Sequence, residues 1–466
     1  MSIRNIIKNL KTVKKLHLHP PKRYQEILNV VSSKPPMSAS SASSSLSDLD
    51  LETLHLVLAD PRVKSSTCLK FFNFLVKNQS FISFKPDLQA HLTLIGRLVK
   101  ARNFSQAENL FRSVSIRESS GCPFADIAST VEIFCDETLV KAKLFNVMLK
   151  VYSDNGKFDQ VLVVFDYMKS NGIEIDDRTC TVHLLALKRA DQVDPSIDFL
   201  YRMLESNVEV SEYSLSVVVA GLCSNGEIER SRELVEEMVD RGTELSTITF
   251  NTMLDACSKR WNFVELDLIL GLMEKEGLGY DIHTYRILIN GFTSFGKVKE
   301  AESLIKEMHD KGLKVETHLY NLLTNGFCRA GCMESACLVF DEMTERNVNQ
   351  NADTYLVVIS GLCKNGEMEK AMEYWNEMQN KGIEVEGVMF NTLIDGFCNK
   401  RMINEAYELL LVMEMNGFHL DLSVCNKILM GLCELNQGRE AKRLFNIMIK
   451  RGAASKLASF THLVNI

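Results

Sequence analysis

The chain contains 466 residues, of which 46% are hydrophobic and 24% charged, and its formal net charge is −7. This acidic balance excludes a protein that attracts polyanions through a generally basic surface, so any nucleic-acid binding must come from locally placed cations. The 13 cysteines fit reduced thiols in an intracellular or organellar compartment better than a secreted disulfide framework.

The first 37 residues have the composition of an organelle presequence. Residues 1–25 carry seven Lys or Arg and no acidic residue, and Ile3, Ile6 and Ile7 lie on one apolar helical face. This pattern predicts a transit peptide over 1–37, mitochondrial by preference, with a chloroplast address or a surface helix as alternatives. The sequence contains no apolar run of the length that a secretory signal or a membrane span needs.

Three irregular segments follow the presequence. Serine-rich residues 38–52 are predicted to form a disordered spacer. Residues 53–114 are predicted to form degenerate repeat-like helices, because apolar residues return there in helical phase. Residues 115–141 interrupt the pattern, contain Pro123, and are predicted to be an extended loop or a degenerate insert.

A 35-residue period organises residues 142–456. Nine consecutive units begin at 142, 177, 212, 247, 282, 317, 352, 387 and 422, and the clearest is GVMFNTLIDGFCNKRMINEAYELLLVMEMNGFHLD at 387–421. A fixed period of this size indicates a solenoid built from one repeated supersecondary unit. Residues 457–466 are predicted to be the truncated start of a further unit.

Each unit is predicted to be a helical hairpin. Apolar residues recur at positions 4, 7, 8 and 11 of a unit and again at 20, 24 and 27, which is the spacing of a helical face. Glycine or a short polar break near positions 15 and 31 ends the two helices. One hairpin cannot bury both apolar stripes alone, so neighbours must stack, and the predicted fold class is an all-α solenoid superhelix.

Cysteine positions indicate packing rather than chemistry. One cysteine per hairpin at a constant phase is typical of a small buried residue. The cluster Cys328, Cys332 and Cys337 lacks the paired C-x2-C spacing of a zinc site, so neither a metal nor a cofactor is predicted. The cysteines at position 12 are Cys223, Cys328, Cys363, Cys398 and Cys433.

These units resemble the pentatricopeptide repeat (PPR) family, in particular its pure 35-residue P class from plant organelles. The family motif YNTLI-x-GLCK-x-G is matched by segments such as YNLLTNGFCRAG at 320 and YLVVISGLCKNG at 355. The resemblance implies a right-handed superhelix that binds single-stranded organellar RNA at one base per repeat. It also implies that residues 5 and 35 of a unit hydrogen-bond the base edge, while residue 2 packs against the base.

Six of the nine units combine Asn, Thr or Ser at position 5 with Asp, Asn or Ser at position 35. In the family the Asn–Asp combination prefers uridine and Asn–Asn leans towards cytidine, so the expected sequence from 5′ to 3′ is Y-R-R-U-N-Y-N-U-Y. Arg286 with Glu316, and Leu356 with Glu386, match no known combination. The predicted base-binding residues are Asn146, Asp176, Thr181, Ser211, Ser216, Ser246, Asn251, Asp281, Asn321, Asn351, Asn391, Asp421 and Asn426.

Four cations share position 13, at the end of the first helix of their units: Arg189, Lys259, Arg329 and Lys364. Cations at one phase would form a basic track for RNA phosphates on an otherwise acidic protein. Lys and Arg near a helix C-terminus also complement the helix dipole, which is the competing explanation for each of them.

Two other classes of function were weighed against RNA binding. A protein-interaction solenoid of the tetratricopeptide type would need no Asn and Asp at two fixed phases, so the sequence favours RNA. An enzyme would need chemistry-bearing motifs, and the H-x-E and P-C-x-x-C pair of the deaminase-like family members is missing from the sequence. The predicted protein is therefore a monomeric, non-enzymatic binder of organellar RNA, and partner proteins would supply any processing activity.

Overall fold

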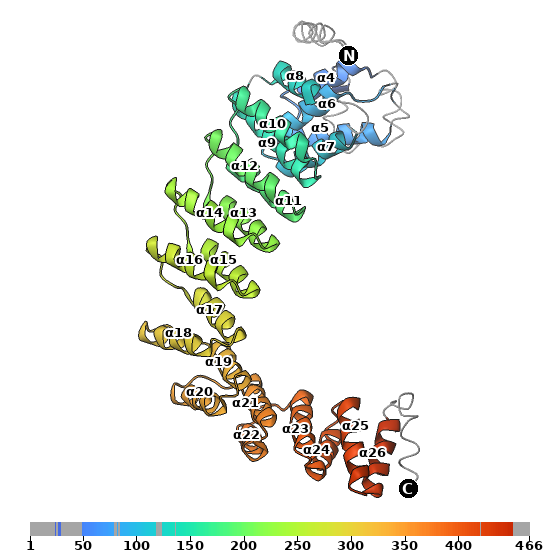
Figure 1. Ribbon diagram of the computed structural model, residues 1–466. Coiled ribbons are helices and arrows are strands. Elements are labelled where there is room, and N and C mark those ends of the chain that lie inside the picture. Colours follow the sequence, from blue (N-terminus) through green and yellow to red (C-terminus); the bar gives the residue numbers. More distant parts are fainter. Residues whose placement is uncertain are drawn as a thin grey trace. The chain divides into compact units, whose positions relative to one another are not determined.

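The computed structural model describes residues 24, 27–28, 49–78, 82, 84–117, 124–135, 137–419 and 421–450. All regular secondary structure within these residues is helical, from α4 to α26 (Figure 1). None of the helices in this part of the chain has the length and hydropathy needed to cross a membrane. The predicted presequence lies outside the described residues except for Tyr24, Ile27 and Leu28, and the predicted unit start at 457–466 lies wholly outside them.

The helices form two compact units by their contacts. Unit 1 comprises residues 1–225 with 238–244, and unit 2 comprises 226–237 with 245–466. The helices before the regular repeats are α4 (Leu51–Ala59), α5 (Ser65–Lys77), α6 (Leu88–Lys100), α7 (Phe104–Arg117) and α8 (Phe124–Phe134).

Every regular 35-residue unit contains the two predicted helices. The first helices of the nine hairpins are α9 (Thr138–Asp154), α11 (Asp177–Arg189), α13 (Glu212–Asn225), α15 (Thr247–Arg260), α17 (Ile282–Ser294), α19 (Thr317–Arg329), α21 (Ala352–Asn365), α23 (Gly387–Asn399) and α25 (Leu422–Glu434). The second helices are α10 (Phe158–Ser170), α12 (Val193–Glu205), α14 (Ile228–Asp240), α16 (Phe263–Lys275), α18 (Val298–Asp310), α20 (Met333–Glu345), α22 (Met368–Asn380), α24 (Ile403–Met415) and α26 (Gly438–Lys450).

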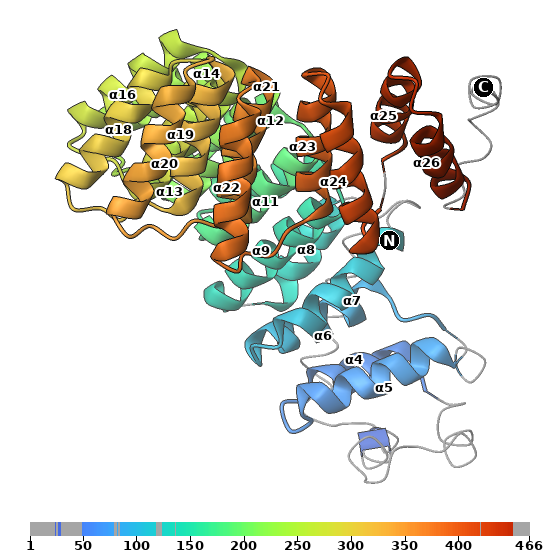
Figure 2. The same cartoon turned by 90° about the horizontal axis from the view of Figure 1, so that it is seen from below.

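Within unit 2 the hairpins stack in chain order. Each first helix from α15 to α23 packs against the first helix of the next hairpin, and α18, α20, α22 and α24 also contact the next first helix. Figure 2 shows the same hairpins from below. The apolar phases are buried as predicted: in the 387–421 unit, Phe390, Leu393 and Ile394 are at most 3% exposed. This burial confirms the all-α solenoid of stacked hairpins.

Position 15 of each hairpin adopts a left-handed backbone conformation. Glycine fills it in five of the nine units, for example Gly156 and Gly366, and such a conformation costs glycine little. Trp261 takes the same conformation with a φ of 59°, which is unfavourable for a bulky residue. The break between the two helices is therefore set by backbone geometry that recurs every 35 residues.

A glycine at position 10 allows the first helices to approach one another closely. A Cβ at Gly361 would lie 2.4 Å from the Sγ of Cys328, and a Cβ at Gly396 would lie 2.9 Å from the Sγ of Cys363. Both cysteines occupy position 12 of the preceding hairpin, so this thiol fills the space that the glycine leaves. Packing of this kind explains why cysteine recurs at a constant phase.

Two predicted boundaries are wrong. Residues 124–134, assigned to an extended loop within the 115–141 insert, form α8, because Ile127, Ala128 and Val131 share one buried helical face. The Ser-rich spacer predicted to reach residue 52 gives way to α4 at Leu51, whose first turn is capped by the Asp50 side chain. The segment predicted as degenerate helices, 53–114, contains most of α4 and α7 and the whole of α5 and α6.

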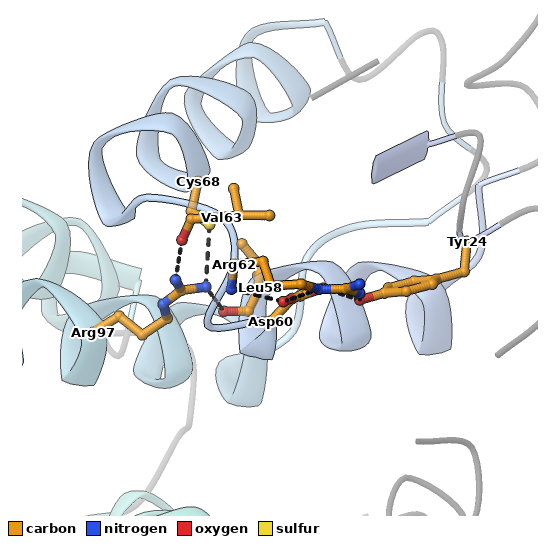
Figure 3. A network of polar contacts seen from close by, with 7 residues as sticks. All are labelled: Tyr24, Leu58, Asp60, Arg62, Val63, Cys68 and Arg97. Carbon is orange, nitrogen blue, oxygen red and sulfur yellow. Dashed lines mark hydrogen bonds and ion pairs between the residues drawn. The ribbon is translucent and has the colours of Figure 1, made fainter. Parts of the chain in front are cut away.

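A network of polar contacts connects residues at the start of unit 1 (Figure 3). Asp60 is 2% exposed, forms an ion pair with Arg62 at 2.7 Å, and accepts a hydrogen bond from the Tyr24 hydroxyl. The hydrogen bonds from Arg62 hold the pKa of Asp60 well below its usual value. Arg97 of α6 donates to the carbonyls of Leu58 and Val63, which fixes the turn between α4 and α5.

Candidate functional site

Positions 5 and 35 of a unit both lie near the N-terminal ends of consecutive first helices. Position 5 lies in the first helix, and position 35 is the residue that precedes the first helix of the next hairpin. The structure brings the two positions together most directly in the 247–281 unit, where the Nδ2 of Asn251 lies 3.3 Å from the Oδ1 of Asp281. The predicted pairing of these phases is therefore a real spatial contact in this unit.

Thr284 completes the arrangement around Asn251. Its hydroxyl lies 2.8 Å from the Oδ1 of Asn251 and 2.8 Å from the Oδ1 of Asp281, so it bridges the amide and the carboxylate. Burial alone would raise the pKa of Asp281, but hydrogen bonds from Thr284, Thr247 and Asn251 lower it below its usual value. An ionised carboxylate only accepts, so it orients the Asn251 amide with the Nδ2 group towards it.

In unit 1 other bonds connect the same phases. The backbone N–H of Asp176 donates to the Oδ1 of Asn146 at 3.1 Å, and the Nδ2 of Asn146 donates to the carbonyls of Ala142 and Glu174. The Thr181 hydroxyl lies 2.7 Å from that of Ser214, which lies 3.0 Å from that of Ser211.

Two predicted pairs in unit 2 have no hydrogen bond between their members. No hydrogen bond between described residues links Asn321 with Asn351 or Asn391 with Asp421. Ser216 belongs to unit 1 and Ser246 to unit 2. Position 35 of the last repeat, which would pair with Asn426, is Lys456 and lies outside the described residues. Ser216 instead donates to the carbonyl of Tyr213 at 2.8 Å.

Position 5 collects polar atoms that lack a partner. Within the described part of the chain, seven buried side-chain polar atoms have no hydrogen bond, and four of these belong to position 5 of different units. They are Arg286 Nε, Asn321 Oδ1, Asn391 Oδ1 and Asn426 Oδ1. A buried polar atom without a partner costs free energy, and here such atoms recur at one phase of the repeat.

Position 35 has a structural role that the sequence interpretation overlooked. Asp281 and Asn351 are the N-caps of α17 and α21, and each takes part in a reciprocal capping box with the threonine three residues later. Asp421 caps α25 by accepting from the N–H of Ser423. Asp, Asn and Ser are preferred N-cap residues in any case, so their presence at position 35 alone does not indicate a ligand.

The four predicted phosphate ligands are all exposed at the ends of their first helices. Lys259 forms an ion pair with Asp255 at 2.6 Å, within its own helix. Among the described residues, Arg189, Arg329 and Lys364 form no ion pair that would occupy their charge. Two units carry an acidic residue at this phase, Asp154 and Glu434, so the basic track is interrupted at those units.

Aliphatic side chains stand exposed at position 2 in two units. Ile248 is 68% exposed and Val388 57% exposed, although both lie in the first turn of their helices. An aliphatic side chain gains by being covered with a flat apolar surface such as the face of a nucleobase. Within the described residues, no group of three or more His, Cys, Asp or Glu is placed to hold a metal ion.

Comparisons with known proteins identify the repeat. Models described as PPR repeat family or PPR repeat match residues 141–189, 211–259, 246–294, 283–313, 315–364, 353–383, 381–414 and 423–452, which together are more than half of the chain.

Two Arabidopsis thaliana proteins are similar in sequence. Pentatricopeptide repeat-containing protein At2g32630 is 37% identical over 153 residues, which are 32% of this chain and 24% of that protein. Putative pentatricopeptide repeat-containing protein At1g19290 is 30% identical over 125 residues, which are 27% of this chain and 13% of that protein. The matches thus span a quarter or less of these relatives' own lengths.

Two solved structures are also similar. The pentatricopeptide repeat protein PPR10 from maize has 18% identity and a TM-score of 0.41, with 89% of this chain and 70% of that chain covered. Yeast Rmd9p in complex with a 16-nt target RNA has 11% identity and a TM-score of 0.38, with 95% and 96% covered. With its family-model matches over more than half of its length, the chain belongs to the PPR repeat family.

Proposed function

We propose that this protein binds single-stranded RNA in a sequence-specific manner, with position 5 of each repeat directed to one base. The observation that carries the proposal is the recurrence of unpartnered polar atoms at position 5 in four repeats of unit 2. A nucleobase edge supplies hydrogen-bond donors and acceptors in the plane of the base. Binding would therefore satisfy atoms that the free protein leaves unsatisfied.

The donor and acceptor groups at position 5 suit base recognition. An asparagine amide offers one acceptor and two donors, so it can pair with a Watson–Crick edge. Asn251 is held by Asp281 in one orientation, which favours one base over others. The proposed preferences are U at the repeats that begin at 247 and 387, and a pyrimidine at those that begin at 142, 317 and 422.

Affinity is proposed to come from the phosphates and from base packing. The exposed cations Arg189, Arg329 and Lys364 would bind phosphates and release counterions. Ile248 and Val388 would each pack against the face of a base, because they are apolar and largely exposed.

The cellular role follows from the family and from the presequence-like start. RNA-binding proteins of the PPR family in plants are typically organellar, and we place this protein in the mitochondrion, with the chloroplast as the alternative. We propose that it acts as a monomer, and that partner proteins carry out the cleavage, splicing or translation of the bound transcript. The same RNA-binding activity would protect a transcript end by blocking exonucleases.

The test is in vitro selection from a random single-stranded RNA pool with the recombinant full chain. We expect enrichment of a motif that carries U at the fourth and eighth of nine positions, counted from the 142 repeat. A pool that stays random after several rounds would refute RNA recognition and support a protein-interaction solenoid instead. Parallel selection with the Asn251→Ala variant controls for background, because only the fourth letter should change.

A further inference from the structure

The repeat at 282–316 has an unusual pair at the two base-facing phases. Position 5 holds Arg286 and position 35 holds Glu316, whereas the preceding repeat holds Asn251 and Asp281. The Nη2 of Arg286 lies 3.2 Å from the Oε2 of Glu316, which is close to the 3.3 Å between Asn251 and Asp281. The arginine–glutamate pair therefore occupies the place of the asparagine–aspartate pair with charged groups.

Neither side chain of this pair is committed to another role. Glu316 precedes α19 but makes no side-chain cap hydrogen bond, unlike Asp281 before α17. The Nε of Arg286 is buried and has no partner among the described residues. Both side chains remain accessible, at 42% and 50% exposed, so a ligand can reach them. The exposed atoms of the guanidinium and of the carboxylate are therefore available to a base, whereas the buried Nε is not.

The chemistry of the pair restricts which base would satisfy it. A guanidinium group only donates hydrogen bonds, and an ionised carboxylate only accepts them. The complementary edge must present an acceptor for arginine beside donors for glutamate. Guanine presents the O6 acceptor next to the N1–H and N2–H donors, whereas uracil has a single N–H donor, and adenine and cytosine each have a single amino group. Guanine is thus the base that satisfies the hydrogen-bonding groups of both arginine and glutamate.

We propose that the 282–316 repeat selects guanine, with Arg286 donating to O6 and Glu316 accepting from N1–H and N2–H. This inference rests on the proposed RNA binding and assigns a letter that the family pattern leaves open. Because the flanking repeats hold Asn251–Asp281 and Asn321–Asn351, the central letters four to six become U-G-Y. A guanidinium that pairs with guanine is also the commonest specific protein contact to that base in duplex DNA.

The experiment measures the affinity of the full chain for four RNA nonamers that differ only at the fifth letter. All carry U at letters four and eight, and binding is followed by fluorescence anisotropy at one fixed salt concentration. We expect the G nonamer to bind about tenfold more tightly than the other three, which is the low end of the discrimination that a bidentate contact provides. Equal affinity for the four nonamers, or a preference for another base, would overturn the inference while leaving RNA binding intact.

Two variants test the roles of the individual groups. Glu316→Gln keeps the length of the side chain but cannot accept from both guanine donors, so the preference for G should shrink several-fold. Arg286→Asn combined with Glu316→Asp recreates the pair of the preceding repeat and should change the preferred fifth letter from G to U. In both variants the preference for U at letter eight must persist, which shows that the protein is folded. Failure of the wild-type chain to bind any of the nonamers would refute the proposed function itself.

Discussion

Asparagine at position 5 and the residue at position 35 have different roles in a repeat. Asn391 has a buried carbonyl without a partner, whereas Asp421 caps the following helix. Removal of the asparagine side chain therefore leaves helix capping intact, and removal of the aspartate side chain affects capping and base recognition together. Substitutions at the two positions can be used to separate these contributions.

We expect Asn391→Ala to weaken RNA binding by about 1–3 kcal/mol, the usual value of a good contact to a base edge, and to relax the choice at the eighth letter. Thermal stability should stay close to that of the wild type, because Asn391 makes no cap. Asp421→Ser keeps a residue that can cap α25, so it tests the contribution of position 35 to the same letter without loss of the cap. Identical base preferences in wild type and Asn391→Ala, measured with nonamers that vary at letter eight, would show that the base-facing phase is misassigned.

His183 makes stability depend on pH within unit 1. The ring is 2% exposed, lies 4.5 Å from the ring of Phe199 by centroid distance, and its Nδ1 lies 3.0 Å from the Ser153 hydroxyl. Burial lowers the pKa of His183 to about 4. The folded state therefore keeps the imidazole neutral at pH values where the unfolded chain already binds a proton.

The contribution of His183 to the free energy of unfolding is fully present above its unfolded-state pKa of about 6.5. It is lost as the pH falls from there towards 4. The loss should reach up to about 3 kcal/mol in the free energy of unfolding of unit 1, from the size of the shift. Urea unfolding at pH 7, 5 and 4 measures it. His183→Phe should show a smaller loss than wild type, and His283→Phe, at an exposed histidine, should match wild type. Equal losses in all three proteins would contradict this account.

At the scale of the helix, the contact between position 10 and position 12 sets how closely first helices approach. Gly361→Ala places a methyl group 2.4 Å from the Sγ of Cys328, so we expect a loss of about 1–3 kcal/mol in unfolding free energy from overpacking. Gly271→Ala in α16 is the matched control, because nothing lies within 4 Å of its added Cβ. That control should gain about 0.5–1 kcal/mol from helix propensity. Thermal denaturation shows whether each variant is less or more stable than the wild type. Destabilisation of both variants would contradict the close-contact explanation.

The helices are predictable from the sequence where the 35-residue period is regular. The prediction fails where that period is interrupted. In the regular repeats the apolar phases and the glycine stops specify each hairpin redundantly, and the buried Phe390, Leu393 and Ile394 follow directly from them. At 124–134 the proline and the broken period outweighed a short helical pattern, so α8 was missed. A sequence also does not reveal which asparagine oxygens lack partners, because that depends on where Thr284 and the capping groups come to lie in three dimensions.

At the scale of the whole molecule, the charge is acidic overall while cations recur at one phase of the first helices. Lys259, Arg329 and Lys364 all belong to unit 2, and their side chains are exposed. If they bind phosphates, each contact contributes about 0.7 to the slope of log affinity against log salt concentration. If they only complement helix dipoles, the salt dependence of RNA binding does not involve them.

We expect the triple substitution of Lys259, Arg329 and Lys364 to Gln to lower that slope by up to about 2, with Lys259 contributing least because Asp255 already neutralises it. The control replaces Lys169, Lys306 and Lys370 with Gln, which removes the same charge from second helices. Affinity for a fixed nonamer between 50 and 200 mM salt, roughly the range over which counterion release is usually followed, gives both slopes. Equal slopes in the two triple variants would show that Lys259, Arg329 and Lys364 have only a structural role.

The cysteines at position 12 give the stack an internal set of chemical reporters. Each of Cys328 and Cys363 is covered by the glycine of the next hairpin, and burial raises the pKa of the Cys363 thiol to about 12. The buried Cys363 thiol reacts with an alkylating reagent only when its two hairpins separate, whereas Cys328 is partly exposed. Pulsed alkylation followed by peptide mass spectrometry would therefore record the opening rate of one named interface at a time. RNA that spans two hairpins should slow labelling of the cysteine between them, so the bound footprint could be located without modifying the protein.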